Sequence, residues 1–225
     1  MKTKEKDLKY IMHTYGRYDV ALKSGKGAVA YDEDGKKYID VSSGIGVNSL
    51  GYCDDGWVKA VSAQAAEIQH MSNYFYSEQA SSLAEKLCTL TGMAKVCFGN
   101  SGAEANECAI KIARKYSFDK YGAGRNEIVT LKNSFHGRTV TTLSATGQEV
   151  FHNYFFPFTE GFVYAEANDF AAISCTSPPQ SSIPTISPIL LTLLTCFIPV
   201  SFCSKYFPFA STSSKNPSEV STLRT

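Results

Sequence analysis

Two short segments of the chain carry residue types suited to binding a small molecule. The first, Gly99 to Glu107, lies between a short apolar run and a helical pattern. Backbone amides at the start of a helix lack intrahelical acceptors and meet the positive end of the helix dipole, so a phosphate is the expected guest. Gly102 permits close backbone approach, and Ser101 could cap the helix or donate to a phosphate oxygen. Taken alone, the segment is more simply an ordinary Ser-capped helix.

The second segment, Asn133 to Thr139, reads Asn-Ser-Phe-His-Gly-Arg-Thr. An aromatic ring, an imidazole and a guanidinium in one loop could stack on a planar heterocycle and clamp a carboxylate through paired hydrogen bonds. Taken singly, Phe135 is equally well explained as a core residue and Arg138 as a solvated charge. A binding site is favoured only when these segments are taken together with the other motifs that fall in order along the chain.

Strands that alternate with helices would bring both segments to one edge of a parallel sheet, outside the carboxyl ends of its strands. Hydrophobic periodicity and capping residues predict these elements before residue 173. They are a hairpin over Gly27 to Val41 with an Asp34-Gly35 turn, helices from Asp54-Asp55 to His70, from Ser77 to Gly92 and from Ala103 to Asp119, and strands over Lys95 to Phe98, Glu127 to Leu131 and Phe162 to Ala165.

Composition narrows the class of partner. The 22 basic and 21 acidic residues give a net charge of +1, which favours a small neutral or zwitterionic ligand over nucleic acid or an anionic membrane. The seven cysteines show no metal or redox spacing, so reduced thiols are expected. His13, His70 and His152 likewise lack metal-ligand spacing, and no metal site is predicted. The charged N-terminus has no signal-peptide core, so a cytoplasmic location is expected.

The composition changes abruptly near Ile173. All 16 glycines precede it, and every proline except Pro157 follows it. We therefore expect residues 173–225 to be an unrelated Ser/Thr/Pro-rich tail, disordered or produced by a shifted reading frame. The apolar run Ile186 to Cys203 keeps a membrane anchor as an alternative, although its length is marginal for a bilayer and two prolines interrupt it.

Several motifs fall in order along the first part of the chain. Besides the two segments above, they are Tyr15-Gly16-Arg17, Asp34-Gly35-Lys36, Tyr38-Ile39-Asp40, Ser43 to Asn48 and Leu50-Gly51-Tyr52. Together they resemble the class III pyridoxal-phosphate-dependent aminotransferases, closest to the acetylornithine aminotransferases. The resemblance covers about residues 6–172.

The resemblance implies an α/β fold, the PLP-dependent transferase fold type I, here incomplete. Residues 1–50 would belong to the small domain and 51–172 to the first part of the cofactor-binding large domain. The cofactor would be pyridoxal 5'-phosphate, the substrates an amino acid and a 2-oxo acid, the assembly a homodimer and the pathway arginine biosynthesis. The implied site residues are Ser101, Gly102 and Ala103 at the phosphate, Phe135 and His136 at the ring, Arg138 at the substrate α-carboxylate and Tyr15 near the substrate side chain.

In this family a lysine holds the cofactor as a Schiff base, and both it and the acid that pairs with the pyridine nitrogen lie beyond Ala172. Lys205 and Lys215 lack the glycine-rich surroundings of that lysine. The chain is therefore expected to be a truncated and inactive N-acetylornithine:2-oxoglutarate aminotransferase with no catalytic residue of its own. The alternatives are another class III donor, such as ornithine or 4-aminobutyrate, a non-catalytic remnant that binds cofactor or a subunit, and a tail-anchored membrane protein.

Overall fold

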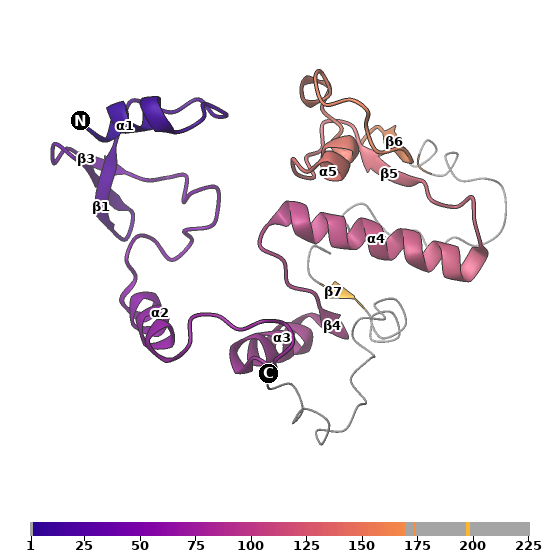
Figure 1. Cartoon of the computed structure of the whole chain (residues 1–225), viewed down its shortest axis with the longest axis horizontal. Helices are drawn as coiled ribbons and strands as arrows, with labels where there is room; N and C mark the ends of the chain where they lie inside the picture. The colour runs from indigo at the N-terminus through magenta and orange to yellow at the C-terminus, as the bar shows by residue number, and fades with distance from the viewer. Residues whose placement is uncertain (1, 170–172, 174–196, 199–225) are drawn as a thin grey trace, which may run out of the picture. The chain divides into compact units, whose positions relative to one another are not determined.

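A computed structural model describes residues 2–169, 173 and 197–198 (Figure 1). The chain divides into two compact units, Met1–Tyr76 and Ser77–Thr225, which are described separately below. The expected domain boundary at residue 50 stays a prediction.

The first unit holds a small antiparallel sheet between two helices. Its strands follow the order β1-β2-β3, and Gly35 with φ 81° makes the turn between β2 and β3. The predicted hairpin is thereby confirmed. Strand β1 was not predicted, because its Leu-Lys-Ser-Gly-Lys sequence has no apolar alternation and is mostly exposed. The elements are α1 (Thr3–Tyr10), β1 (Leu22–Lys26), β2 (Val29–Asp32), β3 (Lys37–Ile39) and α2 (Asp55–Glu67).

Two aspartates organise the turns of this unit. The Asp32 carboxylate accepts a hydrogen bond from the Tyr38 hydroxyl at 2.8 Å. The Asp40 carboxylate accepts from the Ser42 amide at 2.8 Å, from the Ser42 hydroxyl at 2.7 Å and from the Tyr52 hydroxyl at 2.9 Å. The hydrogen bonds from Ser42 and Tyr52 lower the pKa of Asp40 to about 2, because they stabilise its charged form.

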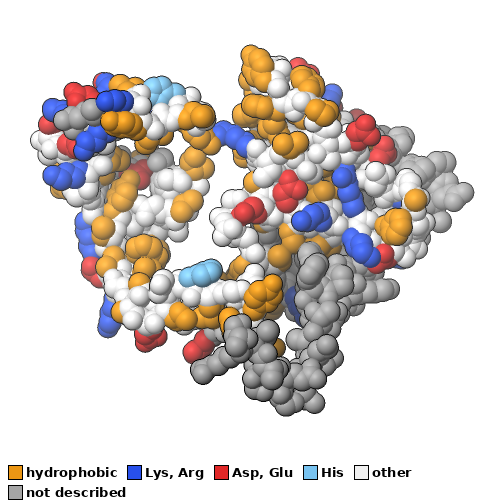
Figure 2. Space-filling model, in the orientation of Figure 1, with side chains coloured by type: hydrophobic (Ala, Val, Ile, Leu, Met, Phe, Trp, Pro, Cys, Tyr) orange, Lys and Arg blue, Asp and Glu red, His pale blue; other side chains and the backbone are white. Residues whose placement is uncertain are grey.

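Little of the first unit is buried. Among residues 2–76, Ala30 is the only buried one, at 2% exposed. The predicted apolar face of α2 is periodic but uncovered, since Trp57 is 56% and Val61 45% exposed. Figure 2 shows apolar side chains at the surface of this unit.

The predicted helix caps are confirmed. Asp54 accepts a hydrogen bond from the Trp57 amide at 2.9 Å and so begins α2. Ser77 accepts from the Ala80 amide at 3.2 Å and begins α3 (Glu78–Thr91), which Gly92 ends in the left-handed conformation at φ 71°.

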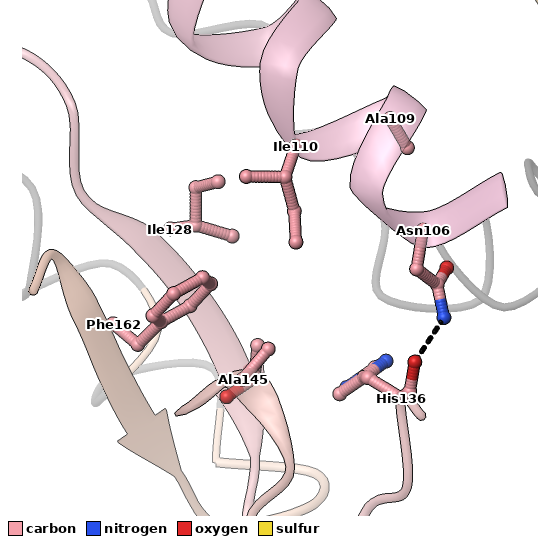
Figure 3. A pocket seen from close by; sticks show the side chains of 8 residues that line it. Asn106, Ala109, Ile110, Ile128, His136, Ala145 and Phe162 are labelled. Carbon is pink, nitrogen blue, oxygen red and sulfur yellow. Dashed lines mark hydrogen bonds between the residues drawn. The ribbon is translucent and has the colours of Figure 1, made fainter. Parts of the chain in front are cut away.

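A parallel strand pair and a long helix form the centre of the second unit. Strands β5 and β6 pair in parallel from Ile128↔Phe162 to Leu131↔Ala165, as the alternation of strands and helices predicted. Side chains of α4 and of this pair line a common small cavity (Figure 3). The elements after α3 are β4 (Lys95–Val96), α4 (Gly102–Tyr121), β5 (Ile128–Leu131), α5 (Val140–Ala145), the 3-10 helix η1 (Glu149–Phe151), β6 (Phe162–Ala165) and β7 (Phe197–Ile198).

Strand β4 differs from its prediction. It is shorter than the expected Lys95 to Phe98, and it pairs antiparallel with β7 rather than joining β5 and β6. Periodicity within one segment carries no information on a partner a hundred residues away, so this pairing could not be predicted.

After Asp169, the structure describes only residues 173 and 197–198. The predictions for the tail therefore lie almost entirely outside the described residues. In the described ranges, no helix is both long and apolar enough to cross a membrane.

Candidate functional site

The N-terminus of α4 is capped from both sides. The Ser101 hydroxyl accepts a hydrogen bond from the Glu104 amide at 3.2 Å, and the Glu104 carboxylate accepts from the Asn100 amide at 2.6 Å. Hydrogen bonding from the Asn100 side chain is the main favourable interaction that lowers the pKa of Glu104, and the backbone amides of Asn100 and Ser101 add to it. The Ser-x-x-Glu spacing is a capping signature, so the part played by Glu104 was available in the sequence although it was not predicted.

Two backbone amides at the start of α4 are left without a hydrogen-bond acceptor by these caps. Those of Gly102 and Ala103 have no acceptor among the described residues. A Cβ atom at Gly102 would meet nothing within 4 Å, so the approach to the first turn is open. Two unpaired donors at the positive end of a helix dipole fit a phosphate group, as the sequence suggested.

Gly137 brings the second predicted segment against this helix end. It is buried, with φ 122°, and a Cβ atom there would lie 2.7 Å from Ala103 Cβ. Only glycine has both the required conformation and the required size. The two segments singled out in the sequence are therefore in direct contact.

Two side chains of α4 fasten the second segment on either side of Gly137. The Asn106 side-chain amide donates to the His136 carbonyl at 2.8 Å (Figure 3), and the Thr139 hydroxyl donates to the Glu107 carboxylate at 2.5 Å. Sequence reasoning gave neither Asn106 nor Glu107 a role. The available signal was their spacing, since they lie four residues after Gly102 and Ala103 and so share their side of the helix.

The His136 ring faces the interior of the second unit. It lines the small cavity with side chains of α4 and β5 (Figure 3), and its Nε2 atom lies 3.1 Å from the Ser134 hydroxyl. Its backbone amide donates to the Thr146 hydroxyl at 3.0 Å. Burial lowers the pKa of the imidazole, which favours the neutral ring. The contacts position the loop, while a contact of His136 with the cofactor stays a prediction.

Two residues that line this cavity each have a buried polar atom, Asn106 Oδ1 and Thr130 Oγ1, without a hydrogen-bond partner within the described part of the chain. Asn106 is thus only partly satisfied, through the amide hydrogen that it donates to His136.

Phe135 and Arg138 lie together on the exposed side of the loop. The Phe135 side chain is 52% exposed and meets the Phe151 ring edge-on at 5.8 Å between centroids. The Arg138 guanidinium carbon lies 5.7 Å from the centroid of Phe135 and 5.6 Å from that of Phe151. These cation–π contacts orient the guanidinium beside an accessible aromatic ring. The pair combines an accessible aromatic surface with a guanidinium, a group that can pair with a carboxylate.

Tyr15 belongs to the first unit, where it is 60% exposed. Its backbone carbonyl accepts a hydrogen bond from the Arg17 guanidinium at 3.5 Å. Its expected approach to the substrate stays a prediction.

Comparison with known proteins identifies the family. The model of the family described as "Aminotransferase class-III" matches residues 10–186. The chain belongs to the class III aminotransferases. This family uses pyridoxal phosphate, and the two unpaired amides at the start of α4 and the exposed Phe135 ring are compatible with such a cofactor. The match also continues past Ala172, where the resemblance predicted from the sequence ended.

Curated members with high similarity carry one name. The acetylornithine aminotransferase of Haemophilus ducreyi is 55% identical over 169 residues, which are 75% of this chain and 43% of the relative. That of Methanocaldococcus jannaschii is 44% identical over 181 residues, 80% of this chain and 46% of the relative. This class III chain therefore spans less than half the length of the curated relatives it matches.

Solved structures confirm the fold. An ornithine aminotransferase from Toxoplasma gondii superposes with a TM-score of 0.72 at 28% identity, over 78% of this chain and 43% of that one. A Bacillus anthracis aminotransferase gives 0.67 at 34%, over 74% and 39%. Another structure of the Toxoplasma enzyme holds pyridoxal phosphate at partial occupancy in its active site. The fold is thus an incomplete α/β segment of the PLP-dependent transferase fold type I.

Proposed function

We propose that the second unit forms the phosphate and ring side of a pyridoxal phosphate site in an aminotransferase that exchanges an amino group between N-acetylornithine and 2-oxoglutarate. The contact between Gly137 and Ala103 carries the proposal, because it joins two unpaired helix amides to a loop with an exposed aromatic ring and a guanidinium. The curated names support the acetylornithine donor.

The residues divide the work by chemistry. The amides of Gly102 and Ala103 would bind the cofactor phosphate, and the Phe135 ring would stack on the pyridine. Arg138 would bind the α-carboxylate of an amino-acid substrate. The cofactor, when bound, supplies an electron sink for the substrate α-carbon. His136 with its lowered pKa adds no positive charge at neutral pH and serves to hold the loop.

Ornithine is the second candidate donor. Ornithine aminotransferases stand among the structural neighbours at TM-scores of 0.71 and 0.72. A panel of amino donors, assayed with a full-length relative that carries this N-terminal sequence, would separate the two.

We also propose that the 225-residue chain by itself does not catalyse transamination. Neither Lys205 nor Lys215 has the glycine-rich surroundings of the cofactor-binding lysine of the family. The expected result is no turnover of N-acetylornithine with 2-oxoglutarate and no borohydride-stable cofactor adduct on either lysine. Turnover by the purified chain would refute this proposal without affecting the phosphate site.

The phosphate site is tested by replacing one amide donor. Gly102→Pro removes the first N–H of α4 at a position where proline is well tolerated, and Ser101 already has the extended backbone that proline requires. Loss of one hydrogen bond to a charged group should weaken pyridoxal phosphate binding by about tenfold or more, measured by equilibrium dialysis. Pyridoxal, which lacks the phosphate, should bind weakly to both proteins.

Glu78→Pro is the matched control, because Glu78 is the first residue of α3 as Gly102 is of α4. Its affinity for pyridoxal phosphate should equal that of the unchanged chain. Equal binding of pyridoxal and pyridoxal phosphate, or full affinity of the Gly102→Pro variant, would reject the site.

A further inference from the structure

Two cysteines lie side by side at the two ends of the segment that joins β4 to the first turns of α4. Cys97 directly follows β4, and Cys108 lies on α4. Their sulfur atoms are 3.1 Å apart, and both residues are part-buried within the second unit. The spacing in sequence, which matches no metal or redox motif, did not indicate this pair.

We propose that Cys97 and Cys108 form an oxidation site that closes to an intramolecular disulfide when the chain meets a low-molecular-weight disulfide such as oxidised glutathione. A disulfide bond measures about 2.05 Å between sulfurs, so closure needs an approach of only about 1 Å. We expect rotation of the two side chains to supply a movement of that size.

The reaction proceeds in two exchanges. The thiolate of one cysteine attacks a sulfur of the oxidant, forms a mixed disulfide and releases one glutathione thiolate. The second cysteine, as its thiolate, then attacks the protein sulfur of that mixed disulfide and releases the second glutathione. Two cysteine thiols are oxidised, one glutathione disulfide is reduced to two thiols, and the protons lost by the cysteines are taken up by the glutathione thiolates.

The location gives the bond a specific consequence. Residues 98–107 would lie inside the closed ring, and they include the first turn of α4 with the amides of Gly102 and Ala103. The bond would connect the end of β4 to the second turn of α4 and so restrict the loop between them. The inference concerns thiol chemistry alone and does not depend on cofactor binding.

Peptide mapping of the full chain tests the proposal. After treatment with oxidised glutathione, free thiols are blocked with iodoacetamide and the chain is cut with trypsin after Lys95 and Lys111, which leaves both cysteines in the peptide Val96–Lys111. We expect this peptide without alkyl groups and two hydrogens lighter than its reduced form. Cleavage after Glu104 should leave the fragments joined until a reductant is added.

Variants and a rate comparison exclude trivial linkage. Cys97→Ser should leave Cys108 alkylated or glutathionylated, whereas Cys88→Ser, a change to another part-buried cysteine, should keep the bond. Native chain should close about tenfold or more faster than chain in concentrated urea, because the fold raises the effective concentration of the thiols. Equal rates, alkylation or glutathione adducts at both cysteines of the native chain, or bonding to another cysteine would overturn the proposal.

Discussion

The two units of the chain keep their shape by different means. In the first, side-chain hydrogen bonds to Asp32 and Asp40 define the turns, and Ala30 is the one buried residue among residues 2–76. In the second, buried side chains from α4 and α5 pack around the parallel strand pair. The two segments singled out in the sequence are therefore positioned by a core, whereas Tyr15 lies in the unit that has one buried residue among residues 2–76.

The core of the second unit includes several buried polar side chains. Thr142 and Thr146 are both 0% exposed, and the Thr146 hydroxyl accepts from the His136 amide and donates to the Thr142 carbonyl at 2.9 Å. These hydrogen bonds offset the desolvation of the buried hydroxyls and fix the loop geometry. A buried polar group left without a partner costs about 1–3 kcal/mol.

The largest effect is expected where the site and the core coincide. Gly137→Ala would place a methyl group 2.7 Å from Ala103 Cβ and force a side chain into the conformation at φ 122°. Backbone strain and overlap together should lower the free energy of unfolding of the second unit by about 3 kcal/mol. Hydrogen–deuterium exchange of the β5 peptide should accelerate, while fluorescence of Trp57 in the first unit stays unchanged.

Gly124→Ala is the control for that experiment. Gly124 has a similar φ of 94°, but nothing lies within 4 Å of its added Cβ. It should cost only the strain, about 1 kcal/mol. A Gly137→Ala chain no less stable than the Gly124→Ala chain would show that the close approach to Ala103 does not exist.

A smaller effect is expected from the clamp between α4 and the loop. Asn106→Ala removes the hydrogen bond to the His136 carbonyl, but it also removes a buried oxygen that has no partner among the described residues. The net loss of stability should therefore be about 1 kcal/mol, seen as a lower urea midpoint and weaker binding of pyridoxal phosphate. Asn153→Ala, which deletes an exposed bond to the Val150 carbonyl, should change neither quantity.

The smallest expected effect is a difference in the pH at which each unit loses stability. Burial lowers the pKa of His136 below 6.5, so the unfolded chain binds its proton more readily and the second unit loses stability as pH falls below about 6.5. Asp40, with its pKa lowered from 3.8 to about 2, stabilises the first unit above pH 3.8 and loses that contribution only between pH 3.8 and about 2.

Amide resonances assigned to each unit should therefore shift toward the unfolded state at different pH values, those of the second unit first. His136→Gln should abolish the loss of stability of the second unit below about pH 6.5. Asp40→Asn should abolish the loss of stability of the first unit between pH 3.8 and about 2. Simultaneous loosening of both units, unaffected by either variant, would contradict the assignment.

The features that were predicted correctly from the sequence are mainly helix caps and turns. Asp54, Ser77 and Ser101 cap the helices that they were predicted to cap, and Gly35 makes the predicted turn. These features depend on contacts within four residues of one another. The two segments that contact each other through Gly137 and Ala103 were also singled out, because glycine, phenylalanine and arginine in short loops have recognisable chemistry, and their roles at a cofactor stay predictions.

The features that were not predicted from the sequence depend on contacts between residues far apart in the chain. The pairing of β4 with β7 joins residues far apart in the sequence. So do the hydrogen bond that Asn106 donates to the second loop and the one that Glu107 accepts from it, which link residues 30 or more positions apart. No periodicity within a single segment encodes such partners. The proximity of Cys97 and Cys108 also escaped, because it follows from the turn that leads into α4 rather than from their spacing.

Helix α4 fixes the position of the second segment relative to the amides at its start. Its first turn carries the amides of Gly102 and Ala103, and its next turn carries Asn106 and Glu107, which hold the loop that bears Phe135. The rotation of the helix about its axis therefore determines both positions together. Inserting or deleting a single residue between Ala103 and Asn106 would rotate one set against the other by about 100°. Variation in the length of this stretch is therefore far less tolerable than variation in its side chains.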